Sequence, residues 1–325
     1  MIKKSPALGL FLTLIICLTA SCSGSASSLA PTPLKVEWTL WQGDYTLLVA
    51  NQMGFFKKHG IAVEPVRYDS ATQAIPDLAG AKLDGGIITM SDALLASSLA
   101  NIKAVFVSDN GGEYAIVASS DIQSVNGLRG KRIGLNLHTS SEMFVSYMLQ
   151  SARMTSNDVT YVETSPSQVS KSIPGQIDAG LVWEPYITQA LQQGKTTVVY
   201  QSDYYSTLIP RLVVFRTAIV EQRPNDIRAF LLAWDEAVQY RINHPQESLA
   251  LISKATGLPA SDLSSTSNST LQTISSNIKL FANTAGSDPS SIYFIAGFNR
   301  DFLLTAGYLT SPPHLDTLLD PAFLK

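Results

Sequence analysis

"LVWEPYI", at residues 181–187, joins an apolar, strand-like run to a segment that suits a helix. Leu181 and Val182 are typical of a strand covered on both faces, and Pro185 suits the first turn of a helix, where its missing N–H costs nothing. The stretch therefore predicts a strand-to-helix turn. In open α/β sheets such turns lie at the carboxyl edge of the parallel strands, where ligands bind. At that edge we expect Trp183, Glu184 and Tyr186.

Short apolar runs alternate with amphipathic stretches along most of the chain. Strands that alternate with helices predict βαβ units and mostly parallel sheets, which is an α/β fold. After Pro224 the pattern becomes almost entirely helical. The predicted strands are residues 36–41, 61–66, 85–89, 103–107, 114–119, 132–136, 159–163, 179–183, 196–200 and 212–216.

Two groups of βα units followed by a helical tail predict two lobes. The second sheet domain would be inserted within the first, and the chain would cross between them near residues 116–120 and 208–212. About 300 residues exceed what one compact core usually holds, which also favours two lobes. We expect lobe 1 at residues 35–117, lobe 2 at 118–209, and a return to lobe 1 with C-terminal helices at 210–325.

Three helix starts have the spacing of a capping box, in which a Ser or Thr side chain and a Glu or Gln three residues later satisfy each other's backbone N–H groups. The predicted boxes are Ser70 with Gln73, Thr139 with Glu142, and Ser165 with Gln168.

The N-terminus has the features of an export signal. Lys3 and Lys4 precede a short apolar stretch that ends in small residues before Cys22, so we expect a signal peptide at residues 1–21. The ending resembles a bacterial lipobox, although Thr19 stands where Leu is usual, and it predicts lipid attachment at Cys22. Residues 22–34 are rich in Ser, Ala and Pro, which predicts a flexible tether. The protein would then be exported and anchored to a membrane, facing the periplasm or the cell exterior.

Charge and motif content argue against several functions. The chain has 23 Lys and Arg against 26 Asp and Glu, a formal net charge of −3, and no basic run, so we expect no nucleic-acid partner. The two cysteines, Cys17 and Cys22, both lie in or next to the signal, which leaves no thiol nucleophile in the body. The four histidines are scattered without metal-ligand spacing. We expect no metal, no cofactor and no catalytic residues.

Hydroxyl, acidic and aromatic residues recur where predicted strands end. With N–H groups at the following helix starts, they suit a small polar ligand. Each also has a plain structural reading, because Ser, Thr and Asp are good caps and Trp is common in cores. The candidate ligand-binding residues are Trp41, Gly43, Asp44, Tyr45, Ser70, Ser91, Asp92, Asp109, Glu113, Thr139, Ser140, Ser141, Glu142, Trp183, Glu184 and Tyr186.

Seven segments together resemble the solute-binding proteins of nitrate, sulfonate, taurine and thiamine-precursor ABC importers. Their order along one chain, behind a lipoprotein-like signal, carries the resemblance. The segments are GFFKKHGI (54–61), GGEYAIVA (111–118), LRGKRIGL (128–135), DAGLVWEPY (178–186), LIPRLVVFR (208–216), SDPSSIY (287–293) and LLDPAFLK (318–325).

The resemblance implies a type II periplasmic-binding fold, with two α/β lobes that close on a ligand. It implies a monomeric receptor that delivers a small polar molecule to an ABC permease with a cytoplasmic ATPase. The family's first-strand turn falls on Trp41, Gly43 and Tyr45, with Asp44 inserted. Where relatives often have a Ser-His pair, this chain has Ser141 and Glu142.

The ligand class stays open at this point, among sulfonate, nitrate, pyrimidine and guanidinium or amine. Carboxylates near the predicted cleft favour a cation, whereas helix N-termini and hydroxyls would hold an anion. A second reading is a ligand-sensing subunit of a membrane signalling protein. A third is an enzyme similar to a thiamine-pyrimidine synthase, although the cysteine-rich motif of that enzyme is absent here.

Overall fold

The computed structural model describes residues 1–2, 32–112, 114–202, 208–263, 271–282 and 288–325. Residues 3–21 of the predicted signal peptide, Cys22 and Glu113 therefore lie outside the described residues. The chain divides into two units, Met1–Ala30 and Pro31–Lys325, and every described helix and strand belongs to the second.

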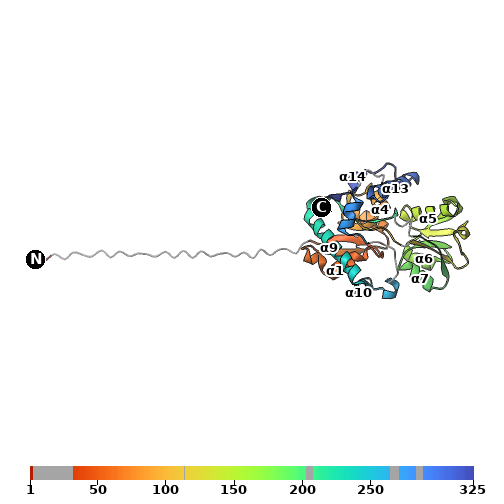
Figure 1. Ribbon diagram of the computed structural model, residues 1–325, viewed down its shortest axis with the longest axis horizontal. Coiled ribbons are helices and arrows are strands. Elements are labelled where there is room, and N and C mark those ends of the chain that lie inside the picture. The colour runs from red at the N-terminus through yellow and green to blue at the C-terminus, as the bar shows by residue number, and fades with distance from the viewer. Residues whose placement is uncertain (3–31, 113, 203–207, 264–270, 283–287) are drawn as a thin grey trace. The chain divides into compact units, whose positions relative to one another are not determined.

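Two five-stranded sheets form the framework of the second unit (Figure 1). The first sheet has the order β2-β1-β3-β10-β4 and the second has the order β7-β6-β8-β5-β9. The strands of the first are β1 (Leu34–Trp38), β2 (Val63–Arg67), β3 (Gly85–Thr89), β4 (Ile102–Asp109) and β10 (Arg211–Arg216). Those of the second are β5 (Tyr114–Ser119), β6 (Arg132–Leu135), β7 (Thr160–Glu163), β8 (Ala179–Val182) and β9 (Thr196–Ser202).

Each sheet contains one strand that runs against the others. In the first sheet, β1 is parallel to β2 and β3, whereas β10 is antiparallel to both β3 and β4. In the second, β6 is parallel to β7 and β8, whereas β5 is antiparallel to both β8 and β9. The reversed strand is in each case the one that enters from the other sheet, so its amino end lies at the edge where the other strands have their carboxyl ends.

All ten predicted strands are present, and their ends differ from the predicted ones by at most three residues. The first crossing differs from expectation. It lies between Asp109 and Tyr114, earlier than residues 116–120, because β5 belongs entirely to the second sheet. The second crossing lies between Ser202 and Arg211.

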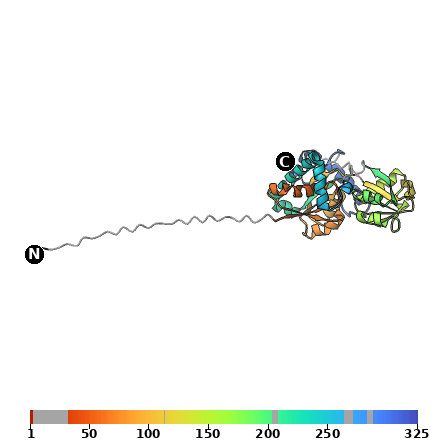
Figure 2. The same ribbon diagram turned by 90° about the horizontal axis from the view of Figure 1, so that it is seen from below.

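Helices cover the faces of both sheets, as Figures 1 and 2 show. Those attached to the first sheet are α1 (Tyr45–Gln52), α2 (Phe55–Lys58), α3 (Ala71–Ala79), α4 (Met90–Ala96), α8 (Thr217–Gln222) and α9 (Pro224–Asn243). Those attached to the second are α5 (Ser140–Ser151), α6 (Pro166–Ser172) and α7 (Tyr186–Gln192). The predicted helical tail is confirmed and contains α10 (Pro245–Thr256), α11 (Ala260–Leu263), α12 (Ile274–Leu280), α13 (Ile292–Thr305) and α14 (Leu315–Leu318). Short 3₁₀ turns lie at Val125–Leu128, Ser156–Asp158 and Pro321–Phe323.

The helix α9 shows how sequence pattern becomes packing. Pro224 occupies its first turn, and its buried side chains recur at the three- and four-residue spacing of a single helical face. Phe230 on that face stacks on Phe56 of α2 and on Trp234, with ring centroids 5.1 and 6.0 Å apart. This face fixes α9 against α1 and α2 and so closes one side of the first sheet.

The three predicted capping boxes are not formed, although the helices begin where they were expected. Ser70 and Ser165 make no side-chain capping bond. Thr139 Oγ1 accepts from the N–H of Ser141, and the Glu142 carboxylate accepts instead from the N–H of His138, at 3.0 Å. Residue spacing alone does not determine which backbone N–H group each side chain reaches.

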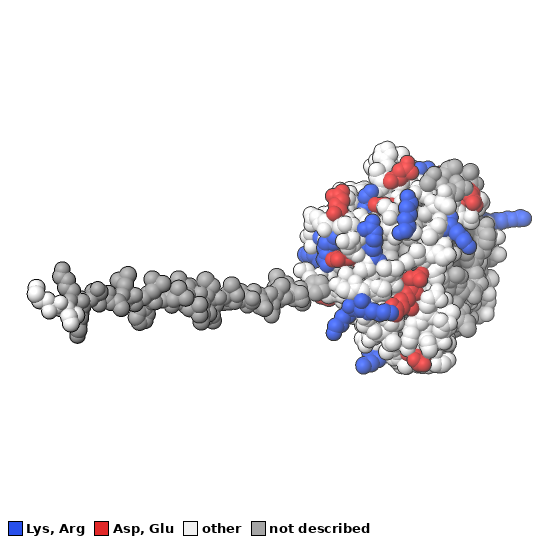
Figure 3. Space-filling model, turned by 60° about the vertical axis from the view of Figure 1, so that its left-hand side comes forward, with Lys and Arg blue, Asp and Glu red and all other residues white. Residues whose placement is uncertain are grey.

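Charged side chains are dispersed over the molecular surface shown in Figure 3, where acidic and basic groups are interspersed. Among the described residues, no helix combines the length and the apolarity needed to cross a bilayer.

Candidate functional site

A cavity of about 20 Å³ lies where the carboxyl edges of the two sheets meet. That volume holds about one water molecule, so the two lobes are closed on each other in this structure. Its lining from the first sheet and its helices is Thr39, Ser70, Ala71, Thr72, Thr89, Asp92 and Arg211. The lining from the second is Tyr114, Asn136, Thr139, Ser140, Ser141 and Trp183.

The N-termini of two helices, one from each lobe, contribute to this lining. Helix α3 begins after Ser70, and α5 begins after Thr139. The first N–H groups of a helix have no partner within it and carry a partial positive charge. The cavity is therefore flanked from both lobes by groups that favour a negative ligand atom.

Several hydroxyl groups at the cavity already donate to the protein. Thr139 Oγ1 donates to the carbonyl of Asn136 at 2.8 Å, and Thr39 Oγ1 donates to Asp44 at 2.9 Å. Ser70 makes no capping bond, and Ser140 Oγ reaches Thr89 Oγ1 across the lobes at 3.5 Å. The serines are thus the hydroxyls best placed to bond a ligand.

Among the described residues, Asp92 is the one carboxylate in the lining of this cavity. Thr89 Oγ1 donates to it at 2.7 Å and accepts from its N–H at 3.1 Å, and Thr72 Oγ1 donates at 3.4 Å. Burial raises the pKa of Asp92, which the hydrogen bond from Thr89 and the charge of Arg211 only partly oppose.

Arg211 supplies a cation that the sequence reasoning missed. Its Nε and Nη2 donate to the two carboxylate oxygens of Asp44 at 2.8 and 2.7 Å, and Nη2 also donates to Thr39 Oγ1 at 3.3 Å and to the carbonyl of Ile87. Burial alone would lower the pKa of Arg211, but the charges of Asp44, Glu37 and Asp109 raise it. The guanidinium therefore stays charged at the floor of the cavity.

Glu37 and Asp109 complete a buried acidic group around Arg211. Glu37 accepts from the N–H of Ile87 at 2.9 Å, its other oxygen has no partner, and burial raises its pKa well above the ordinary value. Burial also raises the pKa of Asp44, although the charge of Arg211 opposes this shift. Burial raises the pKa of Asp109 to about 7. With one guanidinium among these carboxyl groups, bound protons offset part of their negative charge.

Trp41 and Gly43 support this group and do not line the cavity. Trp41 Nε1 donates to Asp109 at 3.2 Å, and its ring lies 5.7 Å from the Arg211 guanidinium. A Cβ atom on Gly43 would lie 1.8 Å from Asp109 Oδ2, so only glycine allows this approach.

The candidate residues from the sequence separate into three groups. Six line the cavity: Ser70, Asp92, Thr139, Ser140, Ser141 and Trp183. Four surround it as support: Trp41, Gly43, Asp44 and Asp109. Five others that the structure describes lie outside the lining: Tyr45, Ser91, Glu142, Glu184 and Tyr186.

Three residues of the last group, Ser91, Glu142 and Glu184, bond to other parts of the protein. Ser91 Oγ donates to Asn299 on α13 at 2.7 Å. Glu184 accepts from the N–H and the hydroxyl of Thr188, both at 3.1 Å, and so caps the start of α7. Glu142 accepts from the hydroxyl of Tyr308. The sequence pattern favoured a cationic ligand because several acids were expected at the cleft. Of those acids that the structure describes, only Asp92 lines the cavity, so this argument for a cation fails.

Tyr114 and Arg211 were missed because each begins a reversed strand. The sequence search examined strand ends followed by helices, whereas β5 and β10 bring their first residues to the same edge. Thr89 ends the predicted strand at residues 85–89, which is a signal that could have identified it. Thr39 directly follows β1 in the structure but lies inside the strand predicted at residues 36–41, so no such signal marked it in the sequence.

Hydrogen bonds across the lobes hold the cavity closed. Trp183 Nε1, from the second lobe, donates to the carbonyl of Leu40 at 2.9 Å. The Tyr308 hydroxyl, from the tail, donates to Glu142 at the start of α5. These contacts depend on closure, since their partners lie on separate sheets and helices.

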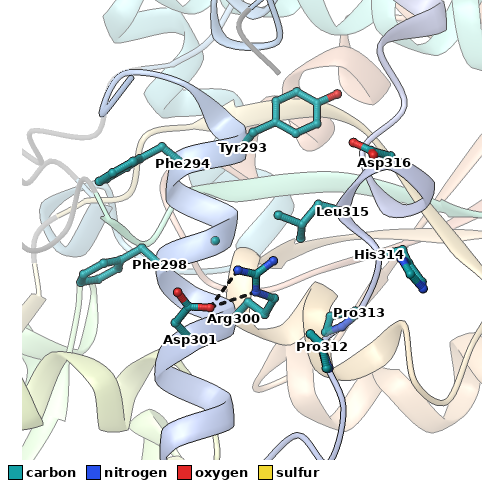
Figure 4. A pocket seen from close by; sticks show the side chains of 11 residues that line it. Tyr293, Phe294, Phe298, Arg300, Asp301, Pro312, Pro313, His314, Leu315 and Asp316 are labelled. Atoms are coloured by element: carbon teal, nitrogen blue, oxygen red, sulfur yellow. Dashed lines mark hydrogen bonds and ion pairs between the residues drawn. The ribbon is translucent and has the colours of Figure 1, made fainter. Parts of the chain in front are cut away.

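A larger hollow of about 630 Å³ lies between α13 and α14 (Figure 4). Arg300 in its wall is paired with the neighbouring Asp301 at 2.9 Å. The N-termini of α3 and α5 do not line this hollow, so the smaller interlobe cavity is the better candidate for the ligand-binding site. Among the described residues, no group of three or more His, Cys, Asp or Glu is placed to hold a metal ion.

Residues 44–248, more than half of the chain, match the model of the family described as NMT1/THI5 like. The chain belongs to this family. A Bacillus subtilis protein provisionally named an aliphatic sulfonates-binding protein is 27% identical over 255 residues, 74% of this chain and 76% of that protein. A provisionally named binding protein of Brucella abortus is 25% identical over 248 residues, 75% of this chain and 77% of that protein.

Solved structures of the same fold include two binding proteins. The alkanesulfonate-binding protein SsuA of Xanthomonas axonopodis pv. citri, bound to MOPS, has a TM-score of 0.73 at 15% identity and covers 90% of this chain and 99% of that chain. The nitrate-binding protein NrtA of Synechocystis has a TM-score of 0.64 at 16% identity, covering 89% and 91%. The expected two-lobed periplasmic-binding fold is confirmed. These relatives are binding proteins and not enzymes, and they support a solute-binding role for this NMT1/THI5-like chain.

Proposed function

We propose that this chain is an extracytoplasmic solute-binding lipoprotein. It captures a small oxoanion, with a sulfonate as the preferred class, between its two lobes and delivers it to an ABC permease. The observation that carries the proposal is the meeting of the α3 and α5 N-termini at a serine-lined cavity with Arg211 at its floor. The names of the sulfonate- and nitrate-binding relatives agree with this ligand class.

An oxoanion needs several donors around one head group. The first N–H groups of α3 and the N–H of Ser140 at the start of α5 supply donors from the two lobes, whereas the N–H of Ser141 already donates to Thr139. The hydroxyls of Ser70, Ser140 and Ser141 add further donors. Such a ligand makes contacts in the closed state that neither lobe offers alone, and this differential binding drives closure.

Asp92 is compatible with an anion only when it carries a proton. Burial raises its pKa, and a protonated carboxyl becomes a hydrogen-bond donor. The aromatic rings of Tyr114 and Trp183 form the rest of the wall. They suit a short apolar substituent on the head group, which a sulfonate has and nitrate lacks.

The lobes must separate before a ligand enters, because about 20 Å³ admits no sulfonate. The interlobe bonds of Trp183 and Ser140 then break and form again around the ligand. Lipid attachment at Cys22 would keep the receptor near its permease, with residues 22–34 as tether.

Calorimetric titration of the purified chain with ethanesulfonate, nitrate and agmatine tests the ligand class. We expect ethanesulfonate to bind more tightly than nitrate, and agmatine, a guanidinium compound, not to bind. Ser141→Ala should weaken ethanesulfonate by about tenfold or more, since a hydrogen bond to a charged group contributes roughly 1.5–3 kcal/mol. Ser98→Ala is the matched control, because Ser98 is exposed and bonds only the carbonyl of Leu95. Binding of agmatine alone would reject the oxoanion proposal.

A further inference from the structure

A second pocket, of about 270 Å³, lies on the first lobe between α1, α10 and the end of α9. Its polar lining includes Tyr45, Arg241 and Ser248, and its apolar wall is formed by Leu249, Ile252 and Leu263. It shares no residue with the lining of the interlobe cavity.

Two side chains of this pocket have hydroxyl groups without a hydrogen-bond partner. Tyr45 is 2% exposed and Ser248 is 3% exposed, and neither Tyr45 Oη nor Ser248 Oγ is bonded to another described group. A buried hydroxyl without a partner costs free energy comparable to a lost hydrogen bond. A ligand that accepts hydrogen bonds would remove this cost, and Ser248 Oγ can turn toward it by rotation about one bond.

Arg241 gives the pocket a positive charge. Its Nη1 donates to Thr46 Oγ1 at 2.7 Å and approaches the carbonyl of Gly43 at 3.5 Å, and both acceptors are uncharged. Burial lowers the pKa of Arg241 to about 10, which the more distant charges of Asp109 and Asp44 only partly oppose. No Asp or Glu is part of the described lining. Among the described residues, the guanidinium therefore has no close counter-ion of the kind that Arg211 has in Asp44.

We infer that this pocket is a second binding site, specific for a small organic monoanion with a carboxylate head and a short aliphatic chain. The head group pairs with Arg241 and accepts from the hydroxyls of Tyr45 and Ser248. The aliphatic chain lies against Leu249, Ile252 and Leu263. The first turn of α10, from which Pro245 and Ser248 line the pocket, adds the partial positive charge of a helix start. The inference is independent of the ligand in the interlobe cavity.

Titration calorimetry of the full chain with sodium butanoate tests the site, with 1-butanol as the neutral probe of the same carbon chain length. Butanoate should bind and 1-butanol should not. Arg241→Gln should weaken butanoate at least tenfold. Arg129→Gln is the matched control, because it removes the same charge from an exposed arginine that is paired with Asp158, and it should leave butanoate binding unchanged.

Two further variants keep the test valid if Arg241→Gln unfolds. Tyr45→Phe and Ser248→Ala remove oxygen atoms that have no partner, so each should fold with an unchanged or higher Tm and bind butanoate severalfold more weakly. The inference is overturned by absent butanoate binding, by equal binding of 1-butanol, or by unchanged binding in these variants. It is also overturned if Ser141→Ala, in the interlobe cavity, is the substitution that abolishes butanoate binding.

Discussion

Arg211 and Asp44 form a two-point ion pair between residues 167 positions apart, with both N–O distances under 3 Å and both side chains almost wholly buried. The pair joins the first residue of β10, where the chain returns from the second lobe, to the start of α1 in the first. It fixes the place where the returning strand enters the sheet, beside the cavity.

Arg211→Met should destabilise the protein by about 3–5 kcal/mol, because it leaves the Asp44 carboxylate buried without its cation. The free energy of unfolding in urea measures the loss. Adding Asp44→Asn should recover a substantial part of it, since the buried charge is then absent. If Arg211→Met alone were as stable as the wild type, the view that this ion pair stabilises the fold would be wrong.

Gly43→Ala should destabilise by more than about 2 kcal/mol, because its Cβ would lie 1.8 Å from a carboxylate oxygen of Asp109. Gly297→Ala provides the control, since the nearest atom to its Cβ is the end of Arg300, at 4.0 Å, and alanine is favoured in the middle of a helix such as α13. Chemical denaturation should show the first variant weakened and the second unchanged or stabilised. Equal effects would show that Asp109 moves aside freely.

The strands and helix starts could be predicted from the sequence because their signals are local. Runs such as GGIIT at residues 85–89 are short, apolar and bounded by turns, and they became strands that are buried throughout. The roles of the acids could not be predicted in this way. Whether Asp44 faces a ligand or an arginine depends on which strand lies beside it, and Arg211 is distant in sequence.

The same limit applies to the lining of the cavity. Ser70, Thr139 and Ser141 were identified because they stand at helix starts after parallel strands. Tyr114 and Arg211 were missed because they begin strands that run the opposite way, and only the sheet order shows that these beginnings reach the site.

Stability should fall as the pH rises from about 4 to 7. The pKa of Asp109 is about 7 in the folded protein against an ordinary value of 3.8, so the folded state holds this proton more tightly than the unfolded state. Its contribution is complete below the ordinary value and is lost as the pH passes through 7. The difference corresponds to at most about 4 kcal/mol. Urea unfolding across this range should show the decline in the free energy of unfolding, and the decline should be smaller in Asp109→Asn. If the decline is unchanged in Asp109→Asn, other titrating groups cause it.

If the chain is a lipoprotein, its lipid should be attached at Cys22. Cells expressing the full chain and fed an alkyne-labelled fatty acid should incorporate the label into the protein and retain it in the membrane fraction. Cys22→Ser should lose both, whereas Cys17→Ser, inside the predicted signal, should lose neither. Labelling that persists in Cys22→Ser would reject the proposed anchor.

Glu184→Gln should leave ligand affinity unchanged. The Glu184 carboxylate accepts from the N–H and the hydroxyl of Thr188 and does not line the cavity, whereas its neighbour Trp183 does. A glutamine keeps one acceptor oxygen for the N–H of Thr188, and its amide NH2 can donate to the Thr188 hydroxyl, which then accepts. The favourable charge at the start of α7 is lost, so the free energy of unfolding should fall by less than about 1 kcal/mol.

Trp183→Phe is the matched comparison from the same turn. It removes the indole N–H that donates to the carbonyl of Leu40 across the lobes at 2.9 Å, and it trims the wall of the cavity. Because that bond forms only on closure, its loss should weaken ethanesulfonate severalfold in the calorimetric titration. If Glu184→Gln weakens binding and Trp183→Phe does not, the acid of this turn contacts the ligand and the indole does not, the reverse of what the structure indicates.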